Sequence, residues 1–352
     1  MSEGTSRDAG SEAPAYGAAG VRLEAAERVK RRFGDLVRST SGPEVLGGLG
    51  GFGGCFAIGR APEADPVLVA SADGVGTKIL VARSAGVHHT VGQDLVNHCV
   101  NDLLASGARP LFFLDYIAAG RLDEEVAVAL VEGFARGCRD NGLALLGGET
   151  AEMPDLYEPE AYDLAGFVVG VAPRARLERW NRCAEPDDVV LGLASSGLHT
   201  NGYTLARKTV QAAGVRLDEE TPWGGETWSE ALLAIHRSYL PAVAPLLDDE
   251  ALRGAAHVTG GGFEGNLPRA LPDGVGALLD RGAWDEPPLF RWISREGGVS
   301  IDEMSRVFNL GIGFCLVVAP EAADRIAAGC AEAGHSARRI GNIVAGSGVQ
   351  WA

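Results

Sequence analysis

The chain has 352 residues, of which 46% are hydrophobic and 22% charged; this is a globular composition, and the length predicts two domains. Its formal net charge of −16 excludes a general binder of nucleic acid or of anionic membranes. An anionic substrate stays possible, because a lysine or a magnesium ion can reverse the field within a cleft.

No apolar run approaches the ~20 residues that span a bilayer, and the N-terminus lacks a basic segment followed by an apolar one. Six cysteines form no Cys-x-x-Cys pair and no metal-finger spacing, which favours free thiols in a reducing compartment. We therefore expect a cytoplasmic protein with no membrane and no nucleic-acid partner.

The N-terminal part contains a tail, a helix and a glycine run. Residues 1–20 are small, polar or acidic and are expected to be a disordered tail, whereas apolar residues recur at helical spacing over 23–37. Eight residues at 47–54, six of them glycine, precede a predicted strand at 55–58. This glycine run is either a flap over phosphates or a tight irregular turn, and the sequence leaves both open.

The next stretch predicts a buried strand at 67–70 that stops at Asp73. Two glycines follow, which let the backbone approach a ligand closely, and then Thr77 and Lys78 offer a hydroxyl and a cation. An acid, a flexible backbone and a lysine at a strand end commonly hold a phosphate and its magnesium ion. A plain Asp-Gly turn is the alternative.

A short helix after Lys78 and a second helix ending at Ala108 come next. The second helix has a predicted buried stripe made of Val96, Cys99, Val100 and Leu103. Its opposite side carries Asp94, Asn97, His98 and Asn101, with Asp102 at the edge. A solvated face is the usual explanation of such a side, but short Asp and Asn side chains favour metal ligation because little entropy is lost.

Two further strands are predicted to end in acids, at Asp115 and at Glu149, with a helix from Asp123 to Gly137 between them. Three strands that each deliver an acid at the carboxyl end could converge on one cation site. A strand at 164–172 then completes the first half, and a linker follows it.

The second half repeats the alternation of strands and helices. A strand at 189–194 leads through a Ser- and Gly-rich loop to a helix at Tyr203, and a strand ending at His257 leads to a glycine loop and a short helix. A strand after Phe308, a helix from Pro320 and a strand near Ile340 close the chain. We predict an α/β (α+β) protein with domains at 21–175 and 176–352, each a mixed sheet covered by helices, and a ligand cleft between them.

These motifs resemble those of the phosphoribosylformylglycinamidine cyclo-ligase (aminoimidazole ribonucleotide synthetase) family, from about Tyr16 to the C-terminus. They are GGLGGFGG (47–54), DGVGTK (73–78), HHTVGQDLVNHCVNDLLASGA (88–108), PLFFLDY (110–116), GGETAEMPDLY (147–157), SSGLHTNGY (195–203), HVTGGGF (257–263) and FNLGIG (308–313).

The resemblance implies a homodimer whose N-terminal domains join their sheets. It also implies a reaction in which formylglycinamidine ribonucleotide and ATP, with Mg²⁺, give aminoimidazole ribonucleotide, ADP and phosphate. The positions that match the family's magnesium ligands are Asp73, Asp94, Asp102 and Glu149. Those that match its nucleotide site are Gly50, Gly51, Gly53, Thr77, Lys78, Asp94 and Asp115.

The implied ribonucleotide-binding residues are Ser195, Ser196, Asn201, Thr259, Gly260, Gly261 and Gly262. The implied catalytic residues are Asp73, Lys78, His199 and His257, where a structural hydrogen bond is the alternative role of each histidine.

One departure lies in the N-terminal arm, where the family has Tyr-Lys-x-Ala-Gly-Val-Asp. This chain has Gly17 in place of the lysine and Arg22 in place of the aspartate, which puts the contacts of that arm in doubt. Two alternatives therefore remain. One is another ATP enzyme of the same superfamily, such as the amidine-forming synthetase, selenophosphate synthetase or thiamine-phosphate kinase. The other is a nucleotide-binding paralogue that has lost turnover.

Overall fold

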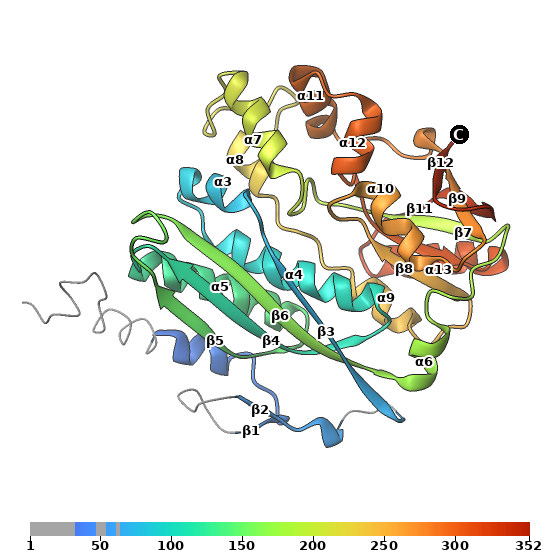
Figure 1. Ribbon diagram of the computed structural model, residues 1–352, viewed down its shortest axis with the longest axis horizontal. Coiled ribbons are helices and arrows are strands. Elements are labelled where there is room, and N and C mark those ends of the chain that lie inside the picture. Colours follow the sequence, from blue (N-terminus) through green and yellow to red (C-terminus); the bar gives the residue numbers. More distant parts are fainter. Residues whose placement is uncertain (1–31, 47–53, 61–63) are drawn as a thin grey trace, which may run out of the picture.

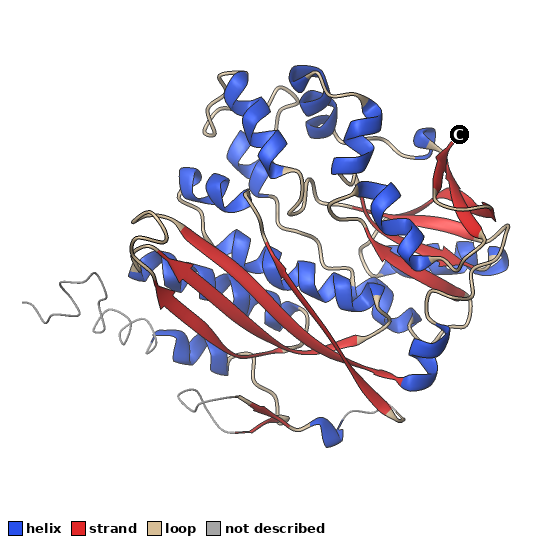
Figure 2. Ribbon diagram, viewed as in Figure 1, coloured by secondary structure: helices blue, strands red, loops and turns tan. Residues whose placement is uncertain are grey.

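The computed structural model describes residues 32–46, 54–60 and 64–352, which form two domains, each built on its own sheet (Figure 1; Figure 2). The glycine run at 47–53, with Gly50, Gly51 and Gly53, and the arm at 16–22 lie outside the described residues. Of the segment predicted as a helix at 23–37, the described part is helical over 32–38. None of the described helices is long and apolar enough to cross a bilayer.

The N-terminal sheet has the order β3-β6-β4-β5, in which β4 and β5 are parallel and the other neighbours antiparallel. Its strands are β3 (Pro66–Gly74), β4 (Arg109–Ala119), β5 (Ala144–Glu152) and β6 (Tyr162–Pro173). A short pair, β1 (Val45–Leu46) and β2 (Cys55–Phe56), precedes it, so the strand expected at 55–58 is only two residues long. The prediction that 67–70 is buried was wrong, since β3 is an edge strand and Leu68 is 55% exposed.

Two helices, α4 (His89–Ala105) and α5 (Glu124–Asp140), cover one face of this sheet, and α3 (Lys78–Ala85) packs against α4 and against α7 and α8 of the C-terminal half (Figure 1). Asp123 caps α5 as predicted, because its carboxylate accepts hydrogen bonds from the backbone N–H groups of Glu125 and Val126. The predicted apolar stripe of α4 is buried. On its polar side Asp94, His98 and Asn101 are buried as well, because α4 lies between the N-terminal sheet and β8 and α9 of the C-terminal domain.

The C-terminal sheet has the order β12-β9-β11-β7-β10-β8, and its neighbours are antiparallel except for β12 and β9. Its strands are β7 (Val189–Ala194), β8 (Leu252–His257), β9 (Val275–Leu279), β10 (Ile312–Val318), β11 (Ala337–Ala345) and β12 (Val349–Trp351). Every residue of β10 is buried, so this strand lies at the centre of the domain core.

The helices of this half are α6 (Arg174–Arg179), α7 (Tyr203–Ala212), α8 (Trp228–Leu233), α9 (Leu240–Val243), α10 (Gly262–Asn266), α11 (Pro288–Gly297), α12 (Ile301–Val307) and α13 (Ala323–Glu332). The predicted strand at 189–194 and the helix start at Tyr203 are confirmed. The predicted linker after the first half is in part wrong, because α6 forms there. The overall prediction of two α/β domains with mixed sheets and packing helices is confirmed.

Candidate functional site between the domains

The polar side of α4 meets the C-terminal domain through a buried ion pair. Lys78 Nζ lies 2.7 Å from Asp94 Oδ2, and both side chains are 0% exposed. The same ammonium donates to the backbone carbonyls of His199 (3.0 Å) and Ala234 (2.8 Å), and Asp94 Oδ1 accepts from the N–H of His236 (2.7 Å). Lys78 and Asp94, both predicted as ligand-binding residues, are therefore used here to join the two domains.

Next to this pair, a chain of polar side chains in close contact begins at β3. Asp73 Oδ2 lies 2.8 Å from His98 Nε2. The other nitrogen of His98, Nδ1, is 2.7 Å from Thr200 Oγ1, which is 3.3 Å from His236 Nδ1. The chain therefore runs from the N-terminal domain into the C-terminal domain.

The chain then returns to α4. His236 Nε2 lies 3.0 Å from His257 Nε2, and His257 Nδ1 lies 2.9 Å from Asp102 Oδ1. The second oxygen of Asp102 accepts from Ser71 Oγ (3.2 Å) and is 3.9 Å from His98 Nε2. Two carboxylates, Asp73 and Asp102, thus lie at the two ends of one network, with their side chains 42% and 27% exposed.

The histidines set the charge state of the two acids. Burial alone would raise the pKa of Asp73 and of Asp102, but the hydrogen bond and the charge of His98 at Asp73, and those of His257 at Asp102, outweigh it and lower both pKa values. Two ionised, partly exposed carboxylates can serve as oxygen ligands of a divalent cation.

The other two predicted acids lie elsewhere, as the strand register shows. Asp73 and Asp115 both pair with Gly166, so they share the face of the sheet that α4 covers, about 10 Å apart across two strand spacings. Burial, with a contribution from Glu149, raises the pKa of Asp115 to about 7. Glu149 pairs with Tyr116, the neighbour of Asp115, so it points to the opposite, open face. Of the four predicted magnesium ligands, only Asp73 and Asp102 come together.

The first loop of the C-terminal domain is held by its own side chains. Ser195 Oγ donates to the carbonyl of Gly197 (3.0 Å), and Ser196 Oγ to that of Ile235. His199 lies at φ +61° beneath this loop, where its Nε2 accepts from the N–H of Ser196 (3.2 Å). Burial, together with the charges of His257 and Lys78, lowers the pKa of His199 well below its usual value, so the ring is neutral.

The glycine loop after β8 is organised by Asn266, a residue that the sequence reasoning did not single out. Its Nδ2 donates to the carbonyls of Thr259 (3.3 Å), Gly260 (3.2 Å) and Gly262 (2.8 Å). Gly262 has φ +60°, and a Cβ there would lie 1.7 Å from the Ser305 carbonyl oxygen, so only glycine fits. Gly260 and Gly261 remain exposed and can approach a ligand.

A cavity of about 560 Å³ lies where the loop after Asp73 meets the loop before α7. Its lining is Gly76, Thr77, Thr200, Asn201, Gly202, Tyr203, Thr204, Leu205, Lys208, Glu303 and Val307. The hydroxyls of Thr77 and Thr204 are 3.0 Å apart, and Asn201 Nδ2 is buried with no hydrogen-bond partner among the described residues. The structure therefore brings the predicted residues Thr77 and Asn201 to one interdomain cavity, with Lys208 as its cation.

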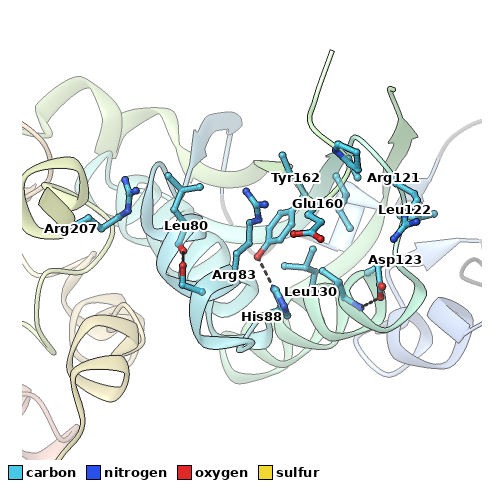
Figure 3. Close-up of a pocket in the computed structure, with 17 residues that line it drawn as sticks. Leu80, Arg83, His88, Arg121, Leu122, Asp123, Leu130, Glu160, Tyr162 and Arg207 are labelled. Carbon is cyan, nitrogen blue, oxygen red and sulfur yellow. Dashed lines mark hydrogen bonds between the residues drawn. The ribbon is translucent and has the colours of Figure 1, made fainter. Parts of the chain in front are cut away.

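A second cavity, also about 560 Å³, is lined by α3, α5 and the segment before β6 (Figure 3). Arg83, Arg121 and Arg207 line it, and His88 Nδ1 lies 2.9 Å from the Tyr162 hydroxyl. None of the predicted site residues lines this cavity.

The sequence reasoning also missed His236 and Thr200. His236 lies in the segment 234–237, which matches no motif, and Thr200 lies inside a quoted motif without an assigned role. A cluster of histidines from four distant segments becomes visible only when the domains are packed together.

Comparison with known proteins gives two family matches and many structural ones. Residues 54–172 match the N-terminal domain, and residues 185–351 the C-terminal domain, of the AIR synthase related proteins. The fold is similar to that of thiamine-monophosphate kinase from Stenotrophomonas maltophilia K279a, with 20% identity, TM-score 0.65, and 92% of this chain and 94% of that chain covered.

It is also similar to E. coli HypE, a hydrogenase maturation protein, with 17% identity, TM-score 0.66 and 94% of each chain covered. A further match is a hydrogenase maturation protein HypE solved in complex with ATP, with 19% identity, TM-score 0.64, and 93% of this chain and 88% of that chain covered. The two matched domains lie in order and together account for most of the chain, which is therefore a two-domain member of the AIR synthase related superfamily.

Proposed function

We propose that this chain is an ATP-dependent cyclo-ligase that converts formylglycinamidine ribonucleotide into aminoimidazole ribonucleotide. One observation carries the proposal: Asp102 of the N-terminal domain contacts His257 of the C-terminal domain, and Asp73 joins through His98 to Thr200, which lines the cavity between the domains. The eight motifs quoted above lie in the order of the cyclo-ligase family, which supports this member of the superfamily over others.

The reaction needs positioning and neutralisation of charge more than it needs a nucleophilic side chain. The γ-phosphoryl group of ATP moves to the formyl oxygen, and ADP leaves. The amidine nitrogen of the same substrate then attacks the formyl carbon, the C–O bond breaks and phosphate leaves, with the nitrogen's proton released. The ring closure is intramolecular because both reacting groups belong to one substrate, whereas the phosphoryl transfer requires ATP and the ribonucleotide to be held together between the domains.

Asp73 and Asp102 would hold the divalent cation, Mg²⁺ on the family resemblance, which neutralises charge on the transferred phosphoryl group. Thr77, Asn201 and Lys208 line the cavity beside these acids and would bind the ribose phosphate together with the exposed Gly260 and Gly261. The buried ion pair of Lys78 and Asp94 would fix the angle between the domains and so the spacing of the two half-sites.

ATP as the phosphoryl donor is supported by the shared fold with the HypE structure solved with ATP. The glycine run at 47–54, with Gly50, Gly51 and Gly53, is proposed to cover the nucleotide phosphates. Asp115 and Glu149 stay proposed contributors to nucleotide and cation binding from the N-terminal sheet.

We also propose a homodimer joined through the open face of the N-terminal sheet. Ser71 contacts Asp102 on α4, so Leu68 and Ala72, at even positions of β3, point away from the helices. Phe167 pairs with Ala72 and therefore shares that face, and it is 46% exposed. Large apolar side chains exposed on the sheet face that none of the described helices covers, next to the open edge of β3, favour association with a second copy.

The mechanism is tested by the fate of one oxygen atom. With formylglycinamidine ribonucleotide labelled with ¹⁸O at the formyl group, the proposal expects the label in the released phosphate, detected by mass spectrometry. Phosphate without label, formed together with product, would mean that ATP hydrolysis is not coupled through that oxygen and would overturn the mechanism.

A second candidate is another phosphoryl-transfer enzyme of the superfamily, favoured by the altered arm at Gly17 and Arg22 and by the kinase fold match. An acceptor panel decides between the two. ATP consumption with thiamine monophosphate and none with formylglycinamidine ribonucleotide would support the kinase.

A further inference from the structure

The second cavity, beside α5, is separate from the interdomain cavity. Its volume of about 560 Å³ lies within the range of about 300–1,000 Å³ that is usual for small-molecule sites. It is lined by α3, α5, the end of β4, the segment before β6 and one residue of α7, and all its lining residues differ from those of the interdomain cavity (Figure 3). We call it the arginine pocket, after Arg83, Arg121 and Arg207 in its lining.

The base of the arginine pocket is apolar. Ile117 and Leu130, both almost fully buried, line it from β4 and α5. The ring of Tyr162 lines it as well, and the hydroxyl of this tyrosine already lies 2.9 Å from His88 Nδ1. Burial raises the pKa of Tyr162, so the phenol stays neutral. The base therefore offers an apolar, partly aromatic surface to a ligand.

The three arginines make the pocket cationic in a chain whose net charge is −16. Within the described part of the chain, no side chain forms an ion pair or a hydrogen bond with the guanidinium group of Arg83, Arg121 or Arg207. Arg83 and Arg207 are half-buried. Figure 3 shows Arg83 between Arg207 at one end of the pocket and Arg121 at the other. Guanidinium groups placed in this way around a cavity favour an anion inside it.

The acidic groups in the lining do not cancel this charge. Asp123 Oδ1 accepts from the backbone N–H groups at the start of α5, so its carboxylate is already used. Glu160 is exposed to solvent and has no ion pair with any described residue. Burial lowers the pKa of His88, and the charge of Arg83 adds to this effect against that of Asp123, so the imidazole is neutral. Three positive charges therefore face two negative ones.

We propose that the arginine pocket binds a small molecule that joins a phosphate group to a flat aromatic ring, as a nucleoside monophosphate does. The guanidinium group of Arg83 would bind the phosphate, because its fork of N–H donors matches phosphate oxygens and its charge does not titrate. The ring would lie on the apolar base beside Tyr162, where aromatic side chains favour stacked or edge contacts.

The position of the pocket connects such a ligand to both domains. Arg83 lies on α3, which begins with Lys78 of the interdomain ion pair. Arg207 lies on α7, next to Lys208 of the interdomain cavity. A ligand that contacts both helices would favour the domain arrangement in which it binds, and its affinity would depend on what occupies the interdomain cavity.

Calorimetry with the full-length protein tests the pocket, with AMP, GMP, CMP and UMP as probes. EDTA is present, so that any binding through a divalent cation is removed. We expect at least one nucleotide to bind with a Kd below about 1 mM, and both its nucleoside and ribose 5-phosphate to bind about tenfold or more weakly. No binding of any of the four nucleotides in this range, or equal affinity for ribose 5-phosphate, overturns the inference.

Three variants locate the bound nucleotide. Arg83→Gln should weaken its binding about tenfold or more, whereas the matched control Arg338→Gln, at an exposed position on β11, should not. Lys208→Gln alters only the interdomain cavity and should also leave the affinity unchanged. A folded Arg83→Gln protein with wild-type affinity, or an equal loss in Lys208→Gln, overturns the assignment. These measurements need no turnover, so they are independent of the proposed function.

Discussion

Asp115 shows how burial changes a carboxyl group that the sequence marks only as an acid near a strand end. Its side chain lies under the helices, and burial raises its pKa from 3.8 to about 7. An acid whose folded-state pKa is raised binds a proton that the unfolded chain has already released between those two pH values. Wild-type stability should therefore fall as pH rises through this window and level off above pH 7.

The change Asp115→Asn removes this titration and should stabilise the protein increasingly as pH rises. About two pKa units separate pH 5 from the folded pKa, so the advantage of the variant should grow by about 2–3 kcal/mol between pH 5 and pH 8. Urea unfolding at both pH values measures it, with the exposed Asp324→Asn as control. An advantage that stays constant with pH would show that Asp115 is not protonated in the folded state.

At the scale of elements, α5 depends on its first turn. Asp123 accepts from two otherwise unpartnered backbone N–H groups of that turn. Asp123→Ala should lower the free energy of unfolding by about 1 kcal/mol, measured by urea denaturation. Glu132→Ala removes the same charge from an exposed position in the middle of the helix and should change stability by less than about 0.5 kcal/mol. Equal losses of stability in the two variants would show that Asp123 does not stabilise α5 as an N-cap.

Local sequence patterns predicted several elements correctly. They failed where packing between elements determines the end of a strand or the burial of a side chain. The strand Val189–Ala194 and the helix start at Tyr203 follow from an apolar run and a glycine-rich break, both local signals. The strand expected to end at Asp115 continues to Ala119, because β6 and β5 supply hydrogen-bond partners on both sides. Strand register of this kind is set by distant segments and cannot be read from one stretch.

In the candidate site, too, local motifs identified some residues, whereas contacts between the domains could not be predicted. The acids at Asp73 and Asp102 and the loop at Thr259–Gly262 could be named from motif and spacing alone. The burial of Lys78 with Asp94 could not be predicted, since it depends on carbonyls at His199 and Ala234 in the other domain. Likewise, the polar side of α4 is buried by the C-terminal domain, which a helical pattern cannot reveal.

At the scale of the whole molecule, the proposed dimer makes a clear prediction. Leu68 lies exposed on the open face of the N-terminal sheet, and a carboxylate there would be buried without a partner in a sheet-to-sheet interface. Leu68→Asp should therefore convert a dimer into a monomer in sedimentation at micromolar concentration. Ile301→Asp, a matched change at an exposed position on α12, should leave the dimer intact. A wild-type monomer over that range would contradict the interface.

In the proposed mechanism, one interdomain site couples ATP to ring closure. The most direct measurement follows ADP and aminoimidazole ribonucleotide together, with purified protein, ATP, formylglycinamidine ribonucleotide and either Mg²⁺ or Mn²⁺. We expect ADP release that depends on the ribonucleotide and equals the aminoimidazole ribonucleotide formed, one for one. Tight ATP binding with no product at high enzyme concentration, with either ion, would contradict it.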